Sequence, residues 1–117
     1  MRKLILVIEQ DPIVGKFLST VLEEEGYAVH VVSDTAQALY IIEAIPPALV
    51  VLDYCVLNDA LLQRLHRHDI PVIMLSDVEA SLAVNASYSN RRPFDPNHLL
   101  SLIERSMRPT VATLAAA

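Results

Sequence analysis

Several residue types that support particular kinds of protein are scarce in this sequence. A single cysteine, Cys55, excludes an internal disulfide and fits a reducing compartment, so we expect a cytoplasmic protein. Two glycines are too few for a glycine-rich loop that cradles phosphate. The apolar runs are far shorter than the roughly 20 residues that span a bilayer, and no cleavage site follows the first run. We therefore expect neither a membrane segment nor a signal peptide.

Positive charge is also scarce. Nine Lys and Arg residues stand against 14 Asp and Glu residues, which gives a net charge of −5. Arg91-Arg92 is the only adjacent basic pair apart from Arg2-Lys3, so the sequence predicts no nucleic-acid surface. With 117 residues, 53% of them apolar, the chain can build one ordered core. We expect that domain over residues 1–109 and an alanine-rich tail over 110–117.

The chain contains a repeated alternation of strand and helix patterns. Short apolar runs predict buried strands over residues 4–8, 27–32, 48–53 and 71–75, and a strand of poorer composition over 88–91. Helical patterns lie between these runs and after the last one. The alternation favours an α/β fold with one doubly wound, five-stranded parallel sheet and helices on both faces. The segment 78–86 is short and weakly helical, so we expect a shortened fourth helix.

The expected helices have recognisable caps and apolar faces. Asp11 with Pro12, Asp34 with Gln37, and Asp59 are predicted to start helices. The residues predicted to face inward are Ile13, Phe17, Val21 and Leu22; Ala38, Leu39, Ile41, Ile42 and Ile45; Leu61, Leu62 and Leu65; and Leu99, Leu100, Leu102, Ile103 and Met107.

The apolar set on the last helix is wider than one sheet-facing stripe requires. Part of it is therefore predicted to contact another chain, as a homodimer or a partner complex. The alternative is that all of its residues fill the core.

Polar side chains follow the predicted strands. Glu9 follows the first strand, Asp53 ends the third, Ser76 ends the fourth, and Arg92 follows the fifth. Ligands of an open α/β sheet bind beyond the carboxyl ends of its strands, so we expect these groups to share one edge. Two acids, a hydroxyl and a cation suit a divalent ion and a phosphoryl group. Taken alone, Asp53 fits equally well as a cap in the following loop.

Four short motifs resemble the receiver domain of bacterial response regulators, the CheY-like family. They are ILVIEQDP (5–12), LVVLD (49–53), PVIMLS (71–76) and RPFD (92–95), and the resemblance extends from Lys3 to Met107. It implies a flavodoxin-like sheet with strand order 2-1-3-4-5. It also implies a stand-alone, divergent receiver in two-component phosphorelay signalling.

The resemblance assigns roles to individual residues. Asp53 matches the aspartate that accepts a phosphoryl group from a histidine kinase or phosphotransfer protein. Mg²⁺ would be held by Glu9, Gln10, Asp53 and the backbone carbonyl of Cys55.

Two further positions match groups that meet the phosphoryl group. Ser76 corresponds to the hydroxyl that contacts it, and Arg92 takes the place of the lysine of the family. Arginine keeps the charge of lysine but has a different shape and hydrogen-bonding geometry.

Other departures from the family pattern leave the chemistry open. Gln10 replaces an acid, so Mg²⁺ binding is expected to be weak or absent. The favoured function is a receiver with weakened Mg²⁺-dependent phosphorylation. The alternative is a pseudo-receiver that binds proteins without being phosphorylated.

Two other classes of function are disfavoured. A flavodoxin-like cofactor site needs a phosphate-cradling loop where this chain has acids, at Glu9 and Asp11. A turnover enzyme is not expected, because Asp53 has no partner base in the sequence pattern.

Overall fold

The computed structural model describes residues 2–53, 58–76, 88–91 and 96–107. The strands are β1 (Leu4–Ile8), β2 (Ala28–Val32), β3 (Leu49–Asp53), β4 (Val72–Ser76) and β5 (Tyr88–Arg91). The helices are α1 (Pro12–Glu24), α2 (Thr35–Ala44), α3 (Asp59–Arg67) and α4 (Pro96–Met107). The predicted short helix at 78–86 and the predicted tail at 110–117 lie outside the described residues.

The strands form one parallel five-stranded sheet in the order β2-β1-β3-β4-β5, which confirms the predicted fold. Each strand ends within a residue or so of its predicted end. The central strands β1 and β3 are buried along almost their whole length, because helices cover both faces of the sheet.

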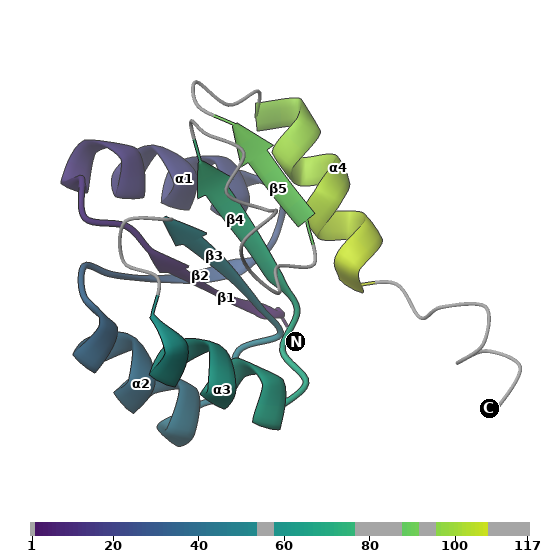
Figure 1. The fold of residues 1–117 in the computed structure, drawn as a ribbon. Coiled ribbons are helices and arrows are strands. Elements are labelled where there is room, and N and C mark those ends of the chain that lie inside the picture. Colours follow the sequence, from purple (N-terminus) through teal and green to yellow (C-terminus); the bar gives the residue numbers. More distant parts are fainter. Residues whose placement is uncertain (1, 54–57, 77–87, 92–95, 108–117) are drawn as a thin grey trace, which may run out of the picture.

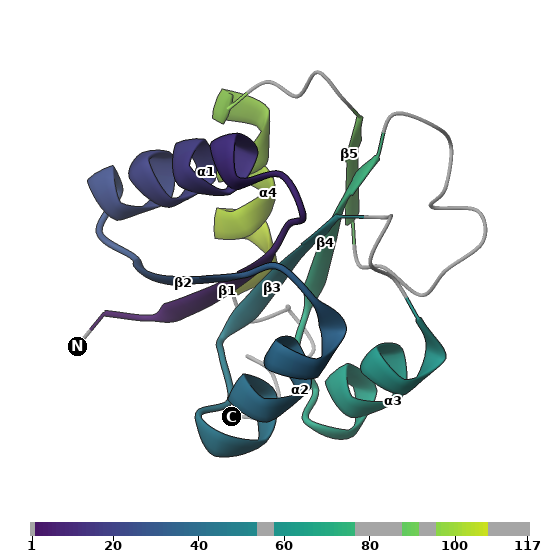
Figure 2. The same cartoon turned by 90° about the vertical axis from the view of Figure 1, so that its left-hand side faces the viewer.

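Helices cover the sheet in two layers. Figures 1 and 2 show α1 and α4 on one face and α2 and α3 on the other. Alternate strand residues divide between these layers: Ile5 and Val7 pack with α1 and α4, whereas Leu6 and Ile8 pack with α2 and α3. None of the described helices is long and apolar enough to cross a membrane.

Side-chain caps start the first three helices. The Asp11 carboxylate accepts from the Ile13 amide at 2.9 Å, and the Asp34 carboxylate accepts from Gln37 at 2.8 Å. The predicted cap Asp59 is wrong, because Asn58 accepts from the Leu61 amide at 2.8 Å. Asp59 lies in the first turn of α3, where its charge favours the helix dipole.

The predicted inward face of α1 is wrong for Ile13 and Phe17, which are 79% and 45% exposed. It is confirmed for Leu22, which faces the core together with Gly15 and Leu18. Gly15 explains why α1 is rotated so that this side faces the sheet. A Cβ atom added at Gly15 would lie 3.0 Å from the Val31 side chain. The missing side chain lets α1 approach β2 closely along this face.

Ile45 is a further error, because it is 60% exposed. Ile45 is the C-cap residue that follows the last turn of α2. Its side chain therefore does not belong to the buried face of the helix, which contains Ala38 and Ile42.

The wide apolar set on α4 belongs to the core. Leu99, Leu102 and Ile103 are buried, and Leu100 and Met107 pack against the same cluster. Leu99, Leu102 and Ile103 therefore fill the core, as the core alternative predicted, while contact with another chain stays a prediction for the partly exposed Leu100 and Met107. The apolar face of α4 is wide because the helix packs against β3 and β5 and joins a core cluster that also contains residues of β1, β4 and α1.

An ion pair joins the two helices of the other layer. The Arg64 guanidinium donates to the Glu43 carboxylate, and this hydrogen bond holds the pKa of Glu43 below its ordinary value. His68 Nε2 lies 3.5 Å from the same carboxylate oxygen, without hydrogen-bond geometry. Both partners of the pair are partly exposed, so it contributes little to the stability of the fold.

Candidate functional site

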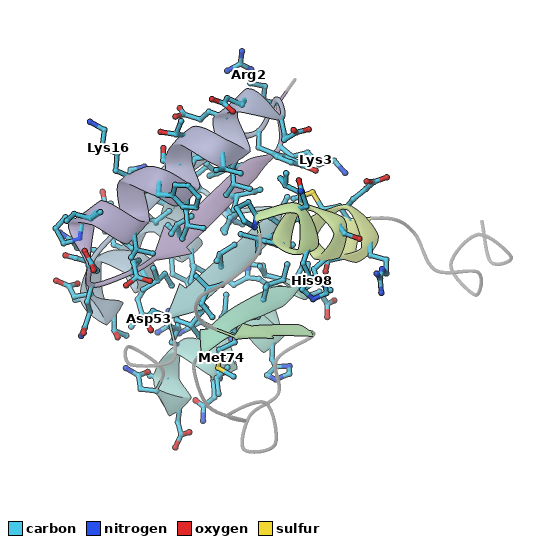
Figure 3. All side chains as sticks on the ribbon, turned by 90° about the horizontal axis from the view of Figure 1, so that it is seen from above. Arg2, Lys3, Lys16, Asp53, Met74 and His98 are labelled. Carbon is cyan, nitrogen blue, oxygen red and sulfur yellow. The ribbon has the colours of Figure 1, made fainter. Side chains whose placement is uncertain are left out.

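Two buried carboxylates lie at the carboxyl edge of the two central strands. Asp53 is the last residue of β3, and Glu9 directly follows β1. Ile8 pairs with Leu52, so Glu9 and Asp53 each come one residue further along neighbouring strands. Their exposed fractions are 3% for Glu9 and 7% for Asp53. Figure 3 shows Asp53 at this edge, in a view from above.

The turn between β1 and α1 fixes the Glu9 carboxylate. The Glu9 amide donates to the Val32 carbonyl at 3.0 Å, which anchors this backbone to the end of β2. The Asp11 amide donates to Glu9 Oε1 at 3.1 Å. Asp11 itself caps α1, so one short turn sets both the helix start and the Glu9 side chain. The sequence predicts Asp11 as a cap, but no residue pattern signals its hydrogen bond to Glu9.

Two buried acids that follow neighbouring strands can offer oxygen ligands to a cation at this edge of the sheet. Carboxylate, amide and carbonyl oxygens are hard donors that suit Mg²⁺. Within the described residues, no three His, Cys, Asp or Glu side chains are arranged to hold one ion. Glu9 and Asp53 could supply the charged part of a donor set for Mg²⁺.

Of the four remaining predicted site residues, the structure describes Gln10 and Ser76. Gln10 follows Glu9 and is exposed. Ser76 ends β4 opposite Arg91, on the strand that neighbours Asp53. Arg92, which follows β5, and Cys55, which follows β3, lie outside the described residues.

Exposed apolar side chains lie on the helix that starts next to these acids. Ile13 and Phe17 are one turn apart on α1, which begins three residues after Glu9. The sequence pattern predicts both in the core, because periodicity alone does not show which side of α1 meets the sheet. Both are instead exposed on the first half of α1.

Known proteins similar to this chain are response regulators. DNA-binding response regulator MtrA of Mycolicibacterium smegmatis is 32% identical, over 92% of this chain and 52% of its own length. The chain thus spans about half the length of the curated MtrA relatives it matches. Protein Rrf1 of Nitratidesulfovibrio vulgaris is 26% identical, over 88% of this chain and 81% of its own length.

Solved structures agree with this relationship. A putative response regulator from Chloroflexus aurantiacus superposes with a TM-score of 0.83 at 22% identity, covering 92% of this chain and 98% of the other. NtrX from Brucella abortus gives a TM-score of 0.82 at 26% identity, covering 92% of this chain and 26% of NtrX. The model of the response regulator receiver domain matches residues 5–104. The chain therefore belongs to the response regulator receiver domain family.

Proposed function

We propose that this receiver domain takes up a phosphoryl group on Asp53 by Mg²⁺-dependent phosphorylation that is weakened compared with other receivers. The observation that supports this best is the pair of buried carboxylates, Glu9 and Asp53, at the ends of adjacent strands. Mg²⁺ supplies positive charge that offsets the negative charge of the incoming phosphoryl group. Glu9, Asp53, the Gln10 amide and the Cys55 carbonyl would hold the ion.

The chemistry assigned to Asp53 is a single phosphoryl transfer. One carboxylate oxygen attacks phosphorus, a P–O bond forms, and the bond from phosphorus to the donor nitrogen breaks. The electron pair of that bond returns to the donor imidazole, and Asp53 becomes an acyl phosphate. Ser76, at the end of the adjacent strand β4, would then contact a phosphoryl oxygen, and Arg92 would balance its charge.

Receiver domains receive phosphoryl groups from histidine kinases or phosphotransfer proteins. A donor protein has to approach the carboxyl edge of the sheet, where Asp53 lies. We infer that it contacts the exposed Ile13 and Phe17 at the start of α1, since exposed apolar pairs commonly mark contacts. This signalling reaction is expected to take place in the cytoplasm, without a turnover reaction of the chain's own.

The alternative function is a pseudo-receiver that acts by protein binding alone. Gln10 favours it, because a neutral, exposed amide stands where the family has a charged ligand of Mg²⁺. The two functions share the fold and the partner surface. They differ in whether Asp53 reacts.

Incubation with acetyl phosphate, with and without Mg²⁺, followed by intact mass measurement distinguishes the two functions. The receiver function predicts a mass gain of one phosphoryl group that depends on Mg²⁺. It also predicts no gain in Asp53→Asn and a reduced gain in Glu9→Gln. Absence of any gain in the unmodified chain at high Mg²⁺ would support the pseudo-receiver.

A further inference from the structure

We propose that the outer edge of β2 pairs with β2 of a second copy of this chain, so that two sheets join into one across a two-fold axis. The axis stands perpendicular to the joined sheet, and the two β2 strands run antiparallel. The contact lies at an edge strand and needs no reaction at Asp53. It is therefore independent of the proposed function.

The outer edge of β2 offers free backbone groups. Among the strands that the structure describes, β2 pairs only with β1. The Ala28 amide donates to the Lys3 carbonyl at 3.0 Å, so every second residue counted from Ala28 faces β1. Val29 and Val31 lie between these residues and direct their amides and carbonyls outward. Two outward-facing residues can form a second ladder with another strand.

This edge also lacks the features that usually prevent strands from pairing. The five residues of β2 include no lysine, arginine, acid or proline. The other edge strand of the described sheet, β5, ends in Arg91. Val31 is 39% exposed, so an apolar side chain lies open on the unprotected edge. These features favour β2 as the edge at which a further strand is added.

The spacing of the outward groups fits a pairing centred on His30. With His30 opposite His30 of the partner copy, Val29 of each copy lies opposite Val31 of the other. Each of these two pairs can exchange two backbone hydrogen bonds. The valine side chains then pair on the α1 face of the joined sheet, where β-branched pairs pack well. The two His30 side chains meet at the axis, on the α2 face.

A groove beside β2 leaves room for the second copy on the α2 face. It has a volume of about 440 Å³ and lies between β2 and α2, with His30, Tyr40 and Ile41 in its lining. The Tyr40 side chain is 73% exposed. A two-fold axis perpendicular to the sheet keeps both α2 helices on one face, so the two grooves open toward each other. The partner copy can then cover Tyr40.

The other face of β2 is covered by α1, which runs antiparallel to the strand. The Leu22 carbonyl accepts from the Tyr27 amide at 3.2 Å, which places the end of α1 at the start of β2. Gly15 lies against Val31, near the end of the strand. Each residue of α1 therefore has a known level along β2.

Charges on α1 are complementary across the proposed axis. Lys16 follows Gly15 and is level with the end of β2, whereas Glu23 follows Leu22 and is level with its start. Both are exposed, and two helical turns separate them on one stripe of α1. Figure 3 shows Lys16 on the side of α1 that lies away from α4. Antiparallel pairing sets the start of one β2 beside the end of the other, so Lys16 of each copy faces Glu23 of its partner.

Sedimentation velocity of the full chain over a range of concentrations tests the pairing. The unmodified chain should show a reversible equilibrium between monomer and dimer. His30→Lys places two like charges opposite each other at the axis and should raise the dissociation constant at least about fivefold. His66→Lys is the control, because His66 is also exposed but lies on α3, and it should leave the constant nearly unchanged.

A charge exchange tests the orientation of the two copies. Lys16→Glu and Glu23→Lys should each weaken the dimer, because each variant opposes like charges across the axis. An equimolar mixture of the two variants should recover the dimer, since a mixed pair restores both opposite-charge contacts. Added salt should reduce these differences. Thermal midpoints at concentrations where every variant is monomeric should match the unmodified chain, which separates association from folding.

Three results would overturn the inference. The first is a monomer at every concentration. The second is a dimer that His30→Lys and His66→Lys affect equally, which would place the contact on another surface. The third is a mixture of Lys16→Glu and Glu23→Lys that associates no better than either variant alone. None of these results bears on phosphorylation of Asp53.

Discussion

Gln10 stands between two acids, Glu9 and Asp11, yet it carries no charge of its own. The chain therefore directs one buried carboxylate from the β1–α1 turn to the site, and a second comes from the end of β3. A neutral amide oxygen binds Mg²⁺ more weakly than a carboxylate. In the proposed function, the affinity for Mg²⁺ would depend on which of these three adjacent residues carries charge.

Gln10→Asp should tighten Mg²⁺ binding about tenfold, because it adds a unit charge next to the two buried acids. Titration calorimetry measures the change directly. Gln63→Asp, which adds the same charge on the exposed face of α3, is the control and should leave the affinity nearly unchanged. If the unmodified chain binds Mg²⁺ as tightly as an ordinary receiver, and Gln10→Asp binds it no more tightly, then Gln10 does not limit the Mg²⁺ affinity of the site.

At the scale of single elements, α1 determines how the site and its surroundings are presented. Asp11 starts the helix, and Gly15 sets its distance from β2. That close approach turns Leu18 and Leu22 inward and leaves Ile13 and Phe17 exposed. One glycine thus influences which side chains α1 exposes.

Gly15→Leu should lower the free energy of unfolding by about 1–3 kcal/mol, because its side chain has to displace Val31 or push α1 away from β2. Urea unfolding measures the change. Lys16→Leu introduces the same residue at the next, exposed position and should change stability by less than about 0.5 kcal/mol. Equal unfolding midpoints for the two variants would mean that α1 does not depend on the close approach at Gly15.

The elements also show what the sequence could predict. Strand ends were predictable, because continuous apolar runs stop at Glu9, Asp53 and Ser76. The face of α1 was not, because the contact between Gly15 and Val31 joins residues from two different elements. Asn58 and Asp59 are both good caps, and only the backbone path before α3 decides between them.

The site was predictable in part, because its two acids stand at strand ends that the apolar runs predict. Topology places Glu9 and Asp53 together once the sheet is parallel and β1 neighbours β3. The hydrogen bond from Asp11 to Glu9 depends on the exact path of one turn, which residue patterns do not encode.

At the scale of the whole molecule, the two helix layers cover the two faces of the sheet. The proposed phosphoryl transfer is therefore expected at the carboxyl edge of β1 and β3. The buried apolar residues of α4 are used within the core, whereas α1, which begins three residues after Glu9, carries the exposed Ile13 and Phe17. A protein that donates a phosphoryl group to Asp53 would approach this edge and contact α1.

Ile13→Ser should slow phosphoryl transfer from protein donors at least several-fold while leaving phosphorylation by acetyl phosphate unchanged. The small donor needs the site but not the apolar contact. A panel of phosphorylated histidine kinases, with transfer followed by intact mass, provides the measurement. Ile45→Ser is the control, because Ile45 is also an exposed isoleucine but follows α2. Equal slowing of both reactions by Ile13→Ser would indicate damage to the site instead of a lost contact.

Asp53 is the residue that we propose accepts the phosphoryl group. After reaction with acetyl phosphate and Mg²⁺, borohydride reduces an acyl phosphate to an alcohol, which marks the modified acid for peptide sequencing by mass spectrometry. We predict homoserine at position 53 in the unmodified chain and at no other acid. Reduction at another carboxylate such as Asp11 or Asp59, or no reduced residue in a fully folded chain, would contradict the assignment.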